Sequence, residues 1–256
     1  MGLPLGNGRQ SAHPGTASKA STLTECTFID MSEMLPLFPL STVLFPGMRL
    51  PLHIFEERYQ TLVADLLAGP EPRRFGVIAI RAGREVGADS VAALHEVGCV
   101  AVMRQAAPTA DGRYDLLTVG TDRFRLLSVD RSLPYLRGEI ELLPDDGAAE
   151  PGAAEAAAGI VRQVQAGFRA YLNALADQGG GVISIADLPD EPGLLSYVIG
   201  AAMIIDLPER QSLLAAPDAM ARLRLERSLL VREIAILRAT TSRPAPDYAH
   251  EQFSPN

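Results

Sequence analysis

Residues 35–59 read LPLFPLSTVLFPGMRLPLHIFEERY and hold four prolines among large apolar side chains. Helices exclude proline at this density, whereas extended segments accept it at their edges and ends. Pro46-Gly47 separates two apolar runs and predicts a tight turn. After Pro51, apolar residues recur every three or four positions, which predicts a helix that opens at Ile54 and carries Phe55 and Tyr59 on its apolar side. The stretch therefore predicts a strand, a turn, a short strand and a helix.

The next hundred residues predict closely spaced strands. Short apolar runs and alternating apolar residues are separated by loop and turn signals, such as Asp111-Gly112. This spacing favours a barrel or a folded sheet over an array of strands and crossover helices. We expect strands at 75–80, 96–105, 114–119, 124–129 and 135–143, a loop at 81–95 and a turn at 120–122.

The composition changes near Pro144, and from Ala148 onward the apolar residues follow a helical period. We expect one helix that ends before residues 179–181, a second capped by Asp190, a short one at 209–214 and a last one capped by Asp218. The predicted divisions are a disordered leader at 1–30, a β-rich subdomain at 31–146, a helical subdomain at 147–240 and a flexible tail at 241–256. The start codon stays open among Met1, Met31 and Met34.

Several pieces of this sequence resemble the N-terminal, substrate-binding domain of Lon proteases. The matching pieces are residues 37–40 (LFPL), 43–47 (VLFPG), 51–59 (PLHIFEERY), 206–211 (DLPERQ) and 232–234 (REI). The resemblance covers about 35–238 and implies an α+β fold, in which a β-rich, PUA-like pseudo-barrel precedes a C-terminal helical bundle. It also implies a mainly structural role for the signature residues Pro39, Pro46, Gly47, Pro51, Phe55, Glu56, Arg58 and Tyr59.

Full Lon proteases continue with an ATPase and a Ser-Lys peptidase, and both activities need a lysine. The only lysine here is Lys19, which lies in the predicted leader, and no phosphate-binding loop motif is present. We therefore expect a stand-alone, non-catalytic member of the family, which carries a peptidase family name by descent only. We expect no cofactor.

Metal and thiol chemistry have little support in the sequence. Cys26 and Cys99 are too few for a disulfide framework. His95-Glu96 lies near Cys99, but zinc sites need three or four converging ligands, so we expect Cys99 to be a small buried apolar residue. His53, inside the signature, is expected to have a positioning role. The sequence therefore predicts no metal site.

The remaining candidate site is the apolar content of the signature. We expect Phe45, Met48 and Leu50, around the Pro46-Gly47 turn, to contact bound polypeptide segments, because stiff turns lose little entropy on binding. An unfolded or peptide segment, or a protease partner, is the expected ligand, in protein quality control. A homodimer stays open.

The alternative is a PUA-like module that binds RNA or nucleotides through strand arginines. The candidates are Arg73, Arg74, Arg81, Arg84, Arg104, Arg113, Arg123 and Arg125. Against it stand the net charge of −8 and the absence of an aromatic stacking ladder. The longest apolar run is shorter than a membrane span, and the first residues lack a signal peptide's apolar core, so we expect a cytoplasmic protein without a membrane partner.

Overall fold

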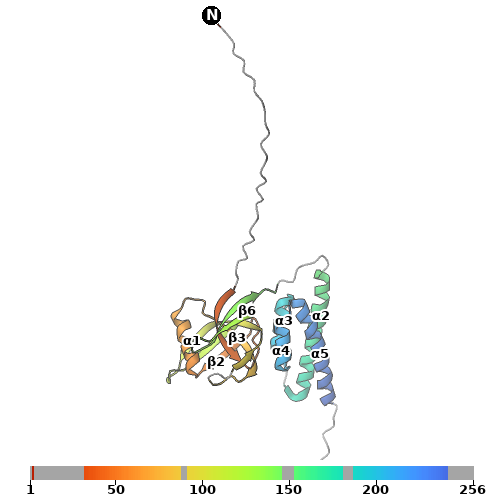
Figure 1. The fold of residues 1–256 in the computed structure, drawn as a ribbon. Helices are drawn as coiled ribbons and strands as arrows, with labels where there is room; N and C mark the ends of the chain where they lie inside the picture. Colours follow the sequence, from red (N-terminus) through yellow and green to blue (C-terminus); the bar gives the residue numbers. More distant parts are fainter. Residues whose placement is uncertain (1, 3–31, 88–90, 146–152, 181–186, 242–256) are drawn as a thin grey trace, which may run out of the picture. The chain divides into compact units, whose positions relative to one another are not determined.

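The computed structural model describes residues 2, 32–87, 91–145, 153–180 and 187–241. The predicted leader apart from Gly2 and nearly all of the predicted tail lie outside these residues, as does the segment 146–152 around the predicted subdomain boundary. Residues 31–256 form one compact unit, to which all the described helices and strands belong (Figure 1). The division of this unit into two subdomains stays a prediction.

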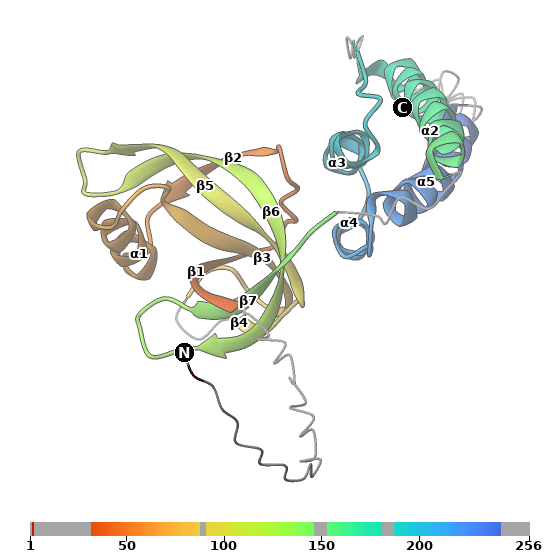
Figure 2. The ribbon, with the colours of Figure 1, turned by 90° about the horizontal axis from the view of Figure 1, so that it is seen from above.

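The strands close into a barrel because β1 pairs on both sides. β1 runs antiparallel to β7 and parallel to β3, so the order β1-β7-β6-β5-β3 returns to its start. β2 adds to β6, and β4 adds to β3 (Figure 2). The strands are β1 (Ser32–Leu40), β2 (Arg49–Ile54), β3 (Arg74–Gly83), β4 (Val91–Leu94), β5 (Val97–Pro108), β6 (Tyr114–Asp130) and β7 (Arg137–Leu143).

Both faces of the central strands are buried. On β5, Cys99 and Ala101 belong to one apolar cluster, and Val100 between them belongs to another. The first cluster also contains Tyr59 of α1 (Glu57–Ala68), which lies against the barrel (Figure 2). Burial on both faces explains why the run from 97 to 102 is continuously apolar rather than alternating.

The signature turn forms as predicted. The amide of Met48 donates to the carbonyl of Phe45 at 3.0 Å, with Pro46 and Gly47 at the centre of the turn. Gly47 has a φ of 80°, which the second central position of a type II turn requires and which proline before it favours. The turn joins β1 to β2, so the predicted order of strand, turn, strand and helix is confirmed.

The turn predicted at 120–122 is wrong, because β6 continues through it as one strand of 17 residues. Gly120 serves a close approach instead. A Cβ there would lie 2.4 Å from the carbonyl oxygen of Phe45, and Gly120 exchanges backbone hydrogen bonds with Gly47 and Met48. Glycine is thus needed where the signature turn rests on β6.

The loop predicted at 81–95 is partly wrong. β3 continues to Gly83, and β4 occupies Val91–Leu94 and pairs antiparallel with β3. The register between these two strands shifts twice, at Ala82 and at Gly83. Such irregular pairing of a four-residue strand leaves little alternation in the sequence, which explains why it was not predicted.

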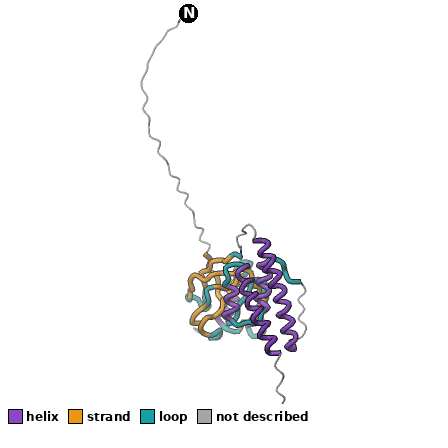
Figure 3. Tube along the Cα trace, turned by 90° about the vertical axis from the view of Figure 1, so that its right-hand side faces the viewer, coloured by secondary structure: helices purple, strands orange, loops and turns teal. Residues whose placement is uncertain are grey.

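The helices α2 to α5 follow the strands in the chain, and Figure 3 separates the two groups by colour. The cap predicted at Asp190 lies one residue later, where the carboxylate of Glu191 accepts from the amides of Gly193 and Leu194. The cap at Asp218 is confirmed, since its carboxylate accepts from the Ala221 amide at 2.7 Å. The helices are α2 (Ala153–Leu175), α3 (Pro192–Ala202), α4 (Leu207–Leu214) and α5 (Ala219–Thr241), and a π-helical turn follows α2 at Ala176–Gly180.

The barrel and the helices share a buried ionic network. Arg123 of β6 is 2% exposed and donates to the carbonyls of Leu214 and Ala216 and to the carboxylate of Asp145. Arg222 of α5, also fully buried, donates to the same carboxylate oxygen at 3.0 Å. Burial alone would raise the pKa of Asp145, but hydrogen bonds from Arg222 and Tyr197 hold it below its ordinary value. One carboxylate, directly after β7, therefore joins β6, α3 and α5.

Candidate functional site

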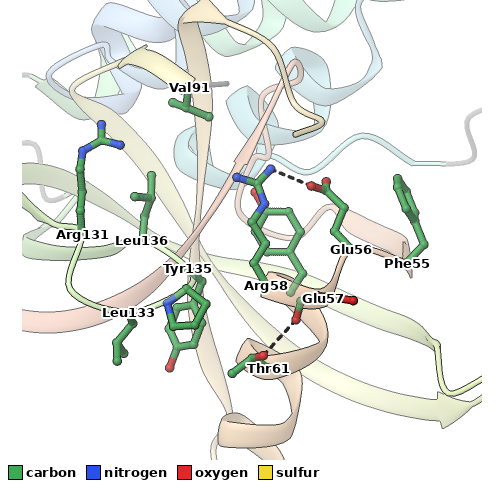
Figure 4. A pocket seen from close by; sticks show the side chains of 12 residues that line it. Phe55, Glu56, Glu57, Arg58, Thr61, Val91, Arg131, Leu133, Tyr135 and Leu136 are labelled. Atoms are coloured by element: carbon green, nitrogen blue, oxygen red, sulfur yellow. Dashed lines mark hydrogen bonds and ion pairs between the residues drawn. The ribbon is translucent and has the colours of Figure 1, made fainter. Parts of the chain in front are cut away.

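A groove of about 710 Å³ lies between the start of α1 and the connection from β6 to β7 (Figure 4). The connection supplies Arg131, Leu133, Pro134, Tyr135 and Leu136, α1 and the residues before it supply Phe55, Glu56, Glu57, Arg58, Tyr59 and Thr61, and β4 supplies Val91. In Figure 4, Arg131 and Phe55 lie at opposite sides of the groove. The lining combines apolar side chains with charges of both signs.

Two large apolar side chains in this groove are open to solvent. Phe55 is 49% exposed and Leu133 is 39% exposed. Phe55 precedes the cap residue Glu56, whose backbone is extended, so Phe55 lies outside the helix whose buried face begins at Tyr59. The expectation that Phe55 belongs to the apolar side of the helix is therefore wrong. Its position suits contact with a ligand better than support of the fold.

A second, smaller pocket of about 160 Å³ adjoins the first, because Phe55, Glu56 and Tyr59 line both. Its other walls come from the end of β1, the end of β2 and the loop after β3, where Val86 is 58% exposed. Phe55 thus stands between two hollows, each with an exposed apolar side chain beside it. This arrangement offers two places for apolar side chains of one ligand.

Arg58 organises the boundary between the two pockets. Its guanidinium pairs with Glu56 at 3.1 Å and donates to the carbonyl of Glu85 at 2.7 Å. The same guanidinium lies over the Tyr59 ring, 4.5 Å from its centroid. The hydrogen bond to Glu85 ties the loop that carries Val86 to the start of α1. Signature residues therefore shape the groove as well as the fold.

The opposite wall is anchored by Tyr135. Its hydroxyl donates to the carboxylate of Asp65 on α1 at 2.7 Å. Burial, together with this hydrogen bond, raises the pKa of Tyr135 to about 12, so the hydroxyl stays protonated and donating at neutral pH. Burial likewise raises the pKa of Tyr59 to about 12. Side-chain contacts with α1 thus hold both walls of the groove in place.

The structure distributes the three predicted contact residues differently from the expectation. Phe45 is fully buried, and Gly200 on α3 lies against its ring, so its expected role as a surface contact is wrong. Met48 and Leu50 are half-buried and pack against the apolar cluster that includes Tyr59. None of the three lines the large groove. A binding role for Met48 and Leu50 stays a prediction.

Five of the eight candidate strand arginines are buried or paired with carboxylates. Arg123 is buried in the ionic network, and Arg74 pairs with Glu33 at 2.9 Å. Arg73, Arg113 and Arg125 also pair with nearby carboxylates. Ion pairing of this kind lowers the positive potential that a nucleic-acid backbone needs.

The candidate metal and thiol residues of the sequence are Cys99, His95 and His53. Within the described ranges, no three His, Cys, Asp or Glu side chains gather as metal ligands. Cys99 is buried, and burial raises the pKa of its thiol, so it packs as an apolar residue. His95 lies beside Arg81, and burial and this charge lower its pKa. His53 is exposed and pairs with Asp115 at 2.7 Å. In the described part of the chain, no helix is long and apolar enough to cross a membrane.

Sequence reasoning missed the groove because its walls come from separate parts of the chain. Leu133 and Tyr135 lie more than seventy residues after Phe55. Tyr135 was expected to begin the strand at 135–143, but it precedes β7 and is 5% exposed. The proline at 134 and the serine at 132 mark a loop, which is the one local signal that this segment leaves the sheet.

Three kinds of comparison agree on the relatives of this chain. Lon protease from Paraburkholderia phytofirmans is 30% identical over 87% of this chain, and Lon protease 2 from Syntrophobacter fumaroxidans is 28% identical over 75% of it. The chain spans about a quarter of the length of these curated relatives, 27% and 24% respectively.

Two solved structures share the fold. A Lon N-terminal domain protein from Xanthomonas campestris matches with a TM-score of 0.52 and 25% identity, over 78% of this chain and 98% of that one. The N-terminal domain of Mycobacterium avium complex Lon protease matches with a TM-score of 0.56 and 17% identity, over 79% and 98%. The family model of the ATP-dependent protease La (LON) substrate-binding domain matches residues 34–232, and the chain therefore belongs to this family.

Proposed function

We propose that this chain binds unfolded or extended polypeptide segments in the groove beside α1, as a non-catalytic binding module. The observation that carries the proposal is the exposure of Phe55 between two adjoining pockets, with Leu133 and Val86 on either side. Apolar side chains gathered around a hollow are typical of surfaces that bind other chains. The family's own description as a substrate-binding domain supports the same role.

The shape of the site favours a polypeptide over a small molecule. Two adjoining pockets that Phe55 lines together can each take an apolar side chain of an extended segment. Glu57 and Arg131 are exposed and bring one charge of each sign to the groove, which suits a ligand of mixed charge. A purely anionic ligand would meet Glu56 and Glu57 as well as the arginines.

The proposal assigns no chemical step to the described residues. Lys19 is the only lysine of the sequence and does not lie in a G-x-x-x-x-G-K-[ST] motif, so we propose no lysine-dependent chemistry. Bound segments would be passed to, or withheld from, a separate protease. This role in protein quality control belongs to the proposal.

The test removes the exposed apolar groups of the groove. Phe55→Ser and Leu133→Ser, singly and together, are titrated against a fluorescently labelled, permanently unfolded polypeptide by anisotropy. Each single change is expected to weaken binding about tenfold, on the order of 1.4 kcal/mol. Both residues are partly exposed, at 49% and 39%, so the melting temperature should stay close to that of the parent.

The matched control is Leu127→Ser on β6. Leu127 is 50% exposed, as Phe55 is, but it does not line either pocket. This variant should bind the unfolded polypeptide as the parent does. Equal binding by the Phe55→Ser, Leu133→Ser double variant would overturn the proposal, and so would an equal loss in the Leu127→Ser control.

A further inference from the structure

Helix α3 and the residues after it carry no charge over a long run. Residues 192–205 read PGLLSYVIGAAMII, without an acidic or basic side chain. One face of α3 is buried through Leu195 and Ile199, in the apolar cluster that it shares with α2 and α5. A helix that is apolar on all sides is ordinarily buried on all sides. Another face of α3 is nevertheless exposed to solvent.

The adjacent face carries an exposed apolar line, here called the α3 stripe: Leu194, Val198 and Ala202 on the helix, with Ile204 just past its end. The first three recur every four residues, so they lie above one another on the helix. Leu194 is 59% exposed, Val198 is 40% exposed, and Ile204, just past the helix end, is 71% exposed. The helical part of the stripe, from Leu194 to Ala202, spans about two turns, along which a partner helix can pack its own side chains.

An acidic residue lies at each end of the α3 stripe. Glu191 precedes α3 and Asp206 follows Ile204 and Ile205, and both are exposed. Their carboxylates accept from the amides of Gly193 and Glu209, at 2.8 and 2.9 Å, which fixes them at these ends. Arg210 is nearby in sequence but is directed inward, where it donates to the Met203 carbonyl and lies over the Phe45 ring.

These end charges argue against a second copy of this chain as the partner. Two α3 helices packed in parallel would place Glu191 beside its own counterpart. Packed antiparallel, they would place Glu191 beside Asp206. Both arrangements bring like charges together at the edges of the contact, which is unfavourable, and the net charge of −8 adds to the repulsion. An anionic membrane surface is disfavoured for the same reason.

We propose that the α3 stripe docks an amphipathic helix of a partner protein, with an apolar line of about two turns and basic residues at both ends. The apolar line would bury the three exposed aliphatic side chains, and the basic ends would meet Glu191 and Asp206. This surface is separate from the groove beside α1, since α3 contributes no residue to either pocket there. A variant that loses binding at one of these surfaces can therefore still be tested for binding at the other.

The test uses two synthetic helical peptides with the same apolar line, one with lysines at both ends and one with glutamates. Anisotropy with the full chain should show binding of the lysine peptide at least tenfold tighter than of the glutamate peptide. Val198→Asp should weaken the lysine peptide about tenfold or more. The matched control is Val231→Asp on α5, which is 67% exposed, outside the stripe, and should bind as the parent does.

Two further variants keep the result interpretable. Leu194→Ser, at a side chain 59% exposed, replaces Val198→Asp if that change lowers the melting temperature. Glu191→Gln with Asp206→Asn keeps oxygen acceptors at both caps but should reduce the salt dependence of lysine-peptide binding. The proposal is overturned if the two peptides bind equally well, or if neither peptide binds. A concentration-dependent dimer of the parent that Val198→Asp abolishes, seen by sedimentation, overturns it in favour of a second copy.

Discussion

The junction around Asp145 and the groove around Phe55 reverse the usual distribution of polar and apolar groups. At the junction, the guanidinium groups of Arg123 and Arg222 are buried, whereas at the groove a phenylalanine side chain is half-exposed. Burying a charge is costly unless it is fully paired, and exposing a large apolar group forfeits its burial free energy. Each departure is therefore tied to a task. The junction holds the barrel and the helices together, and the groove keeps an apolar surface available.

The largest expected effect is at the junction. Asp145→Ala would leave the two buried guanidinium groups of Arg123 and Arg222 without their carboxylate. Removing one partner of a buried charge network costs about 3 kcal/mol or more. The free energy of unfolding, measured by urea denaturation, should fall by that amount.

The matched control is Glu141→Ala, which breaks the exposed pair with Arg125. Exposed ion pairs contribute less than about 1 kcal/mol, so this variant should unfold close to the parent. If Asp145→Ala and Glu141→Ala cost the same, the junction does not hold the two parts together as the contrast requires.

The second effect is a gain of stability close to the junction. Glu226 on α5 is 0% exposed, and its carboxylate has no hydrogen-bond partner among the described residues. Burial raises its pKa to about 9, against a smaller opposing effect of the positive charge of Arg222. The folded protein therefore keeps Glu226 protonated at neutral pH, while the unfolded chain ionises it near pH 4.5.

Between these two pKa values the unfolded state binds fewer protons, so stability should fall as the pH rises, by up to about 1.4 kcal/mol per pH unit. Glu226→Gln removes this dependence. We expect the variant to gain stability relative to the parent as the pH rises from 5 to 8, by up to about 1.4 kcal/mol per pH unit. The free energy of unfolding of both proteins is measured by urea denaturation at each pH. If the difference between variant and parent stays constant from pH 5 to pH 9, the pH dependence does not come from Glu226.

The smallest effect tests the boundary between core and surface at the signature turn. Met48 is half-buried and packs against two apolar clusters. Met48→Asp should therefore lower the free energy of unfolding by about 1 kcal/mol, because part of the side chain would place a carboxylate against apolar neighbours.

Binding separates the two possible roles of Met48. If the groove beside α1 is the site, the folded Met48→Asp variant should hold the unfolded polypeptide as the parent does. A tenfold loss of binding without loss of stability would move the site to the turn, as the sequence alone suggested. Met48→Leu, which keeps the apolar volume, is the control and should change neither quantity.

Local chemistry accounts for what could be predicted from the sequence. Pro46 and Gly47 specify a type II turn through their own backbone preferences, and the apolar period after Tyr59 specifies a helix. The long signature around them is also sufficient to indicate the family. Gly120 shows the limit of such reasoning. Glycine is a turn signal in sequence, but here it permits contact with Phe45, seventy-five residues earlier in the chain.

The sequence by itself determined the class of the fold and most of its order of strands and helices, apart from β4 and the unbroken length of β6. Only the tertiary structure decided which apolar and charged side chains are exposed. Phe55 is exposed and Arg123 is buried. In both cases the exposure depends on surrounding residues that come from distant parts of the chain. Local preference carries no information about such neighbours. Burial depends on them, so the groove and the buried junction exist only in the folded chain.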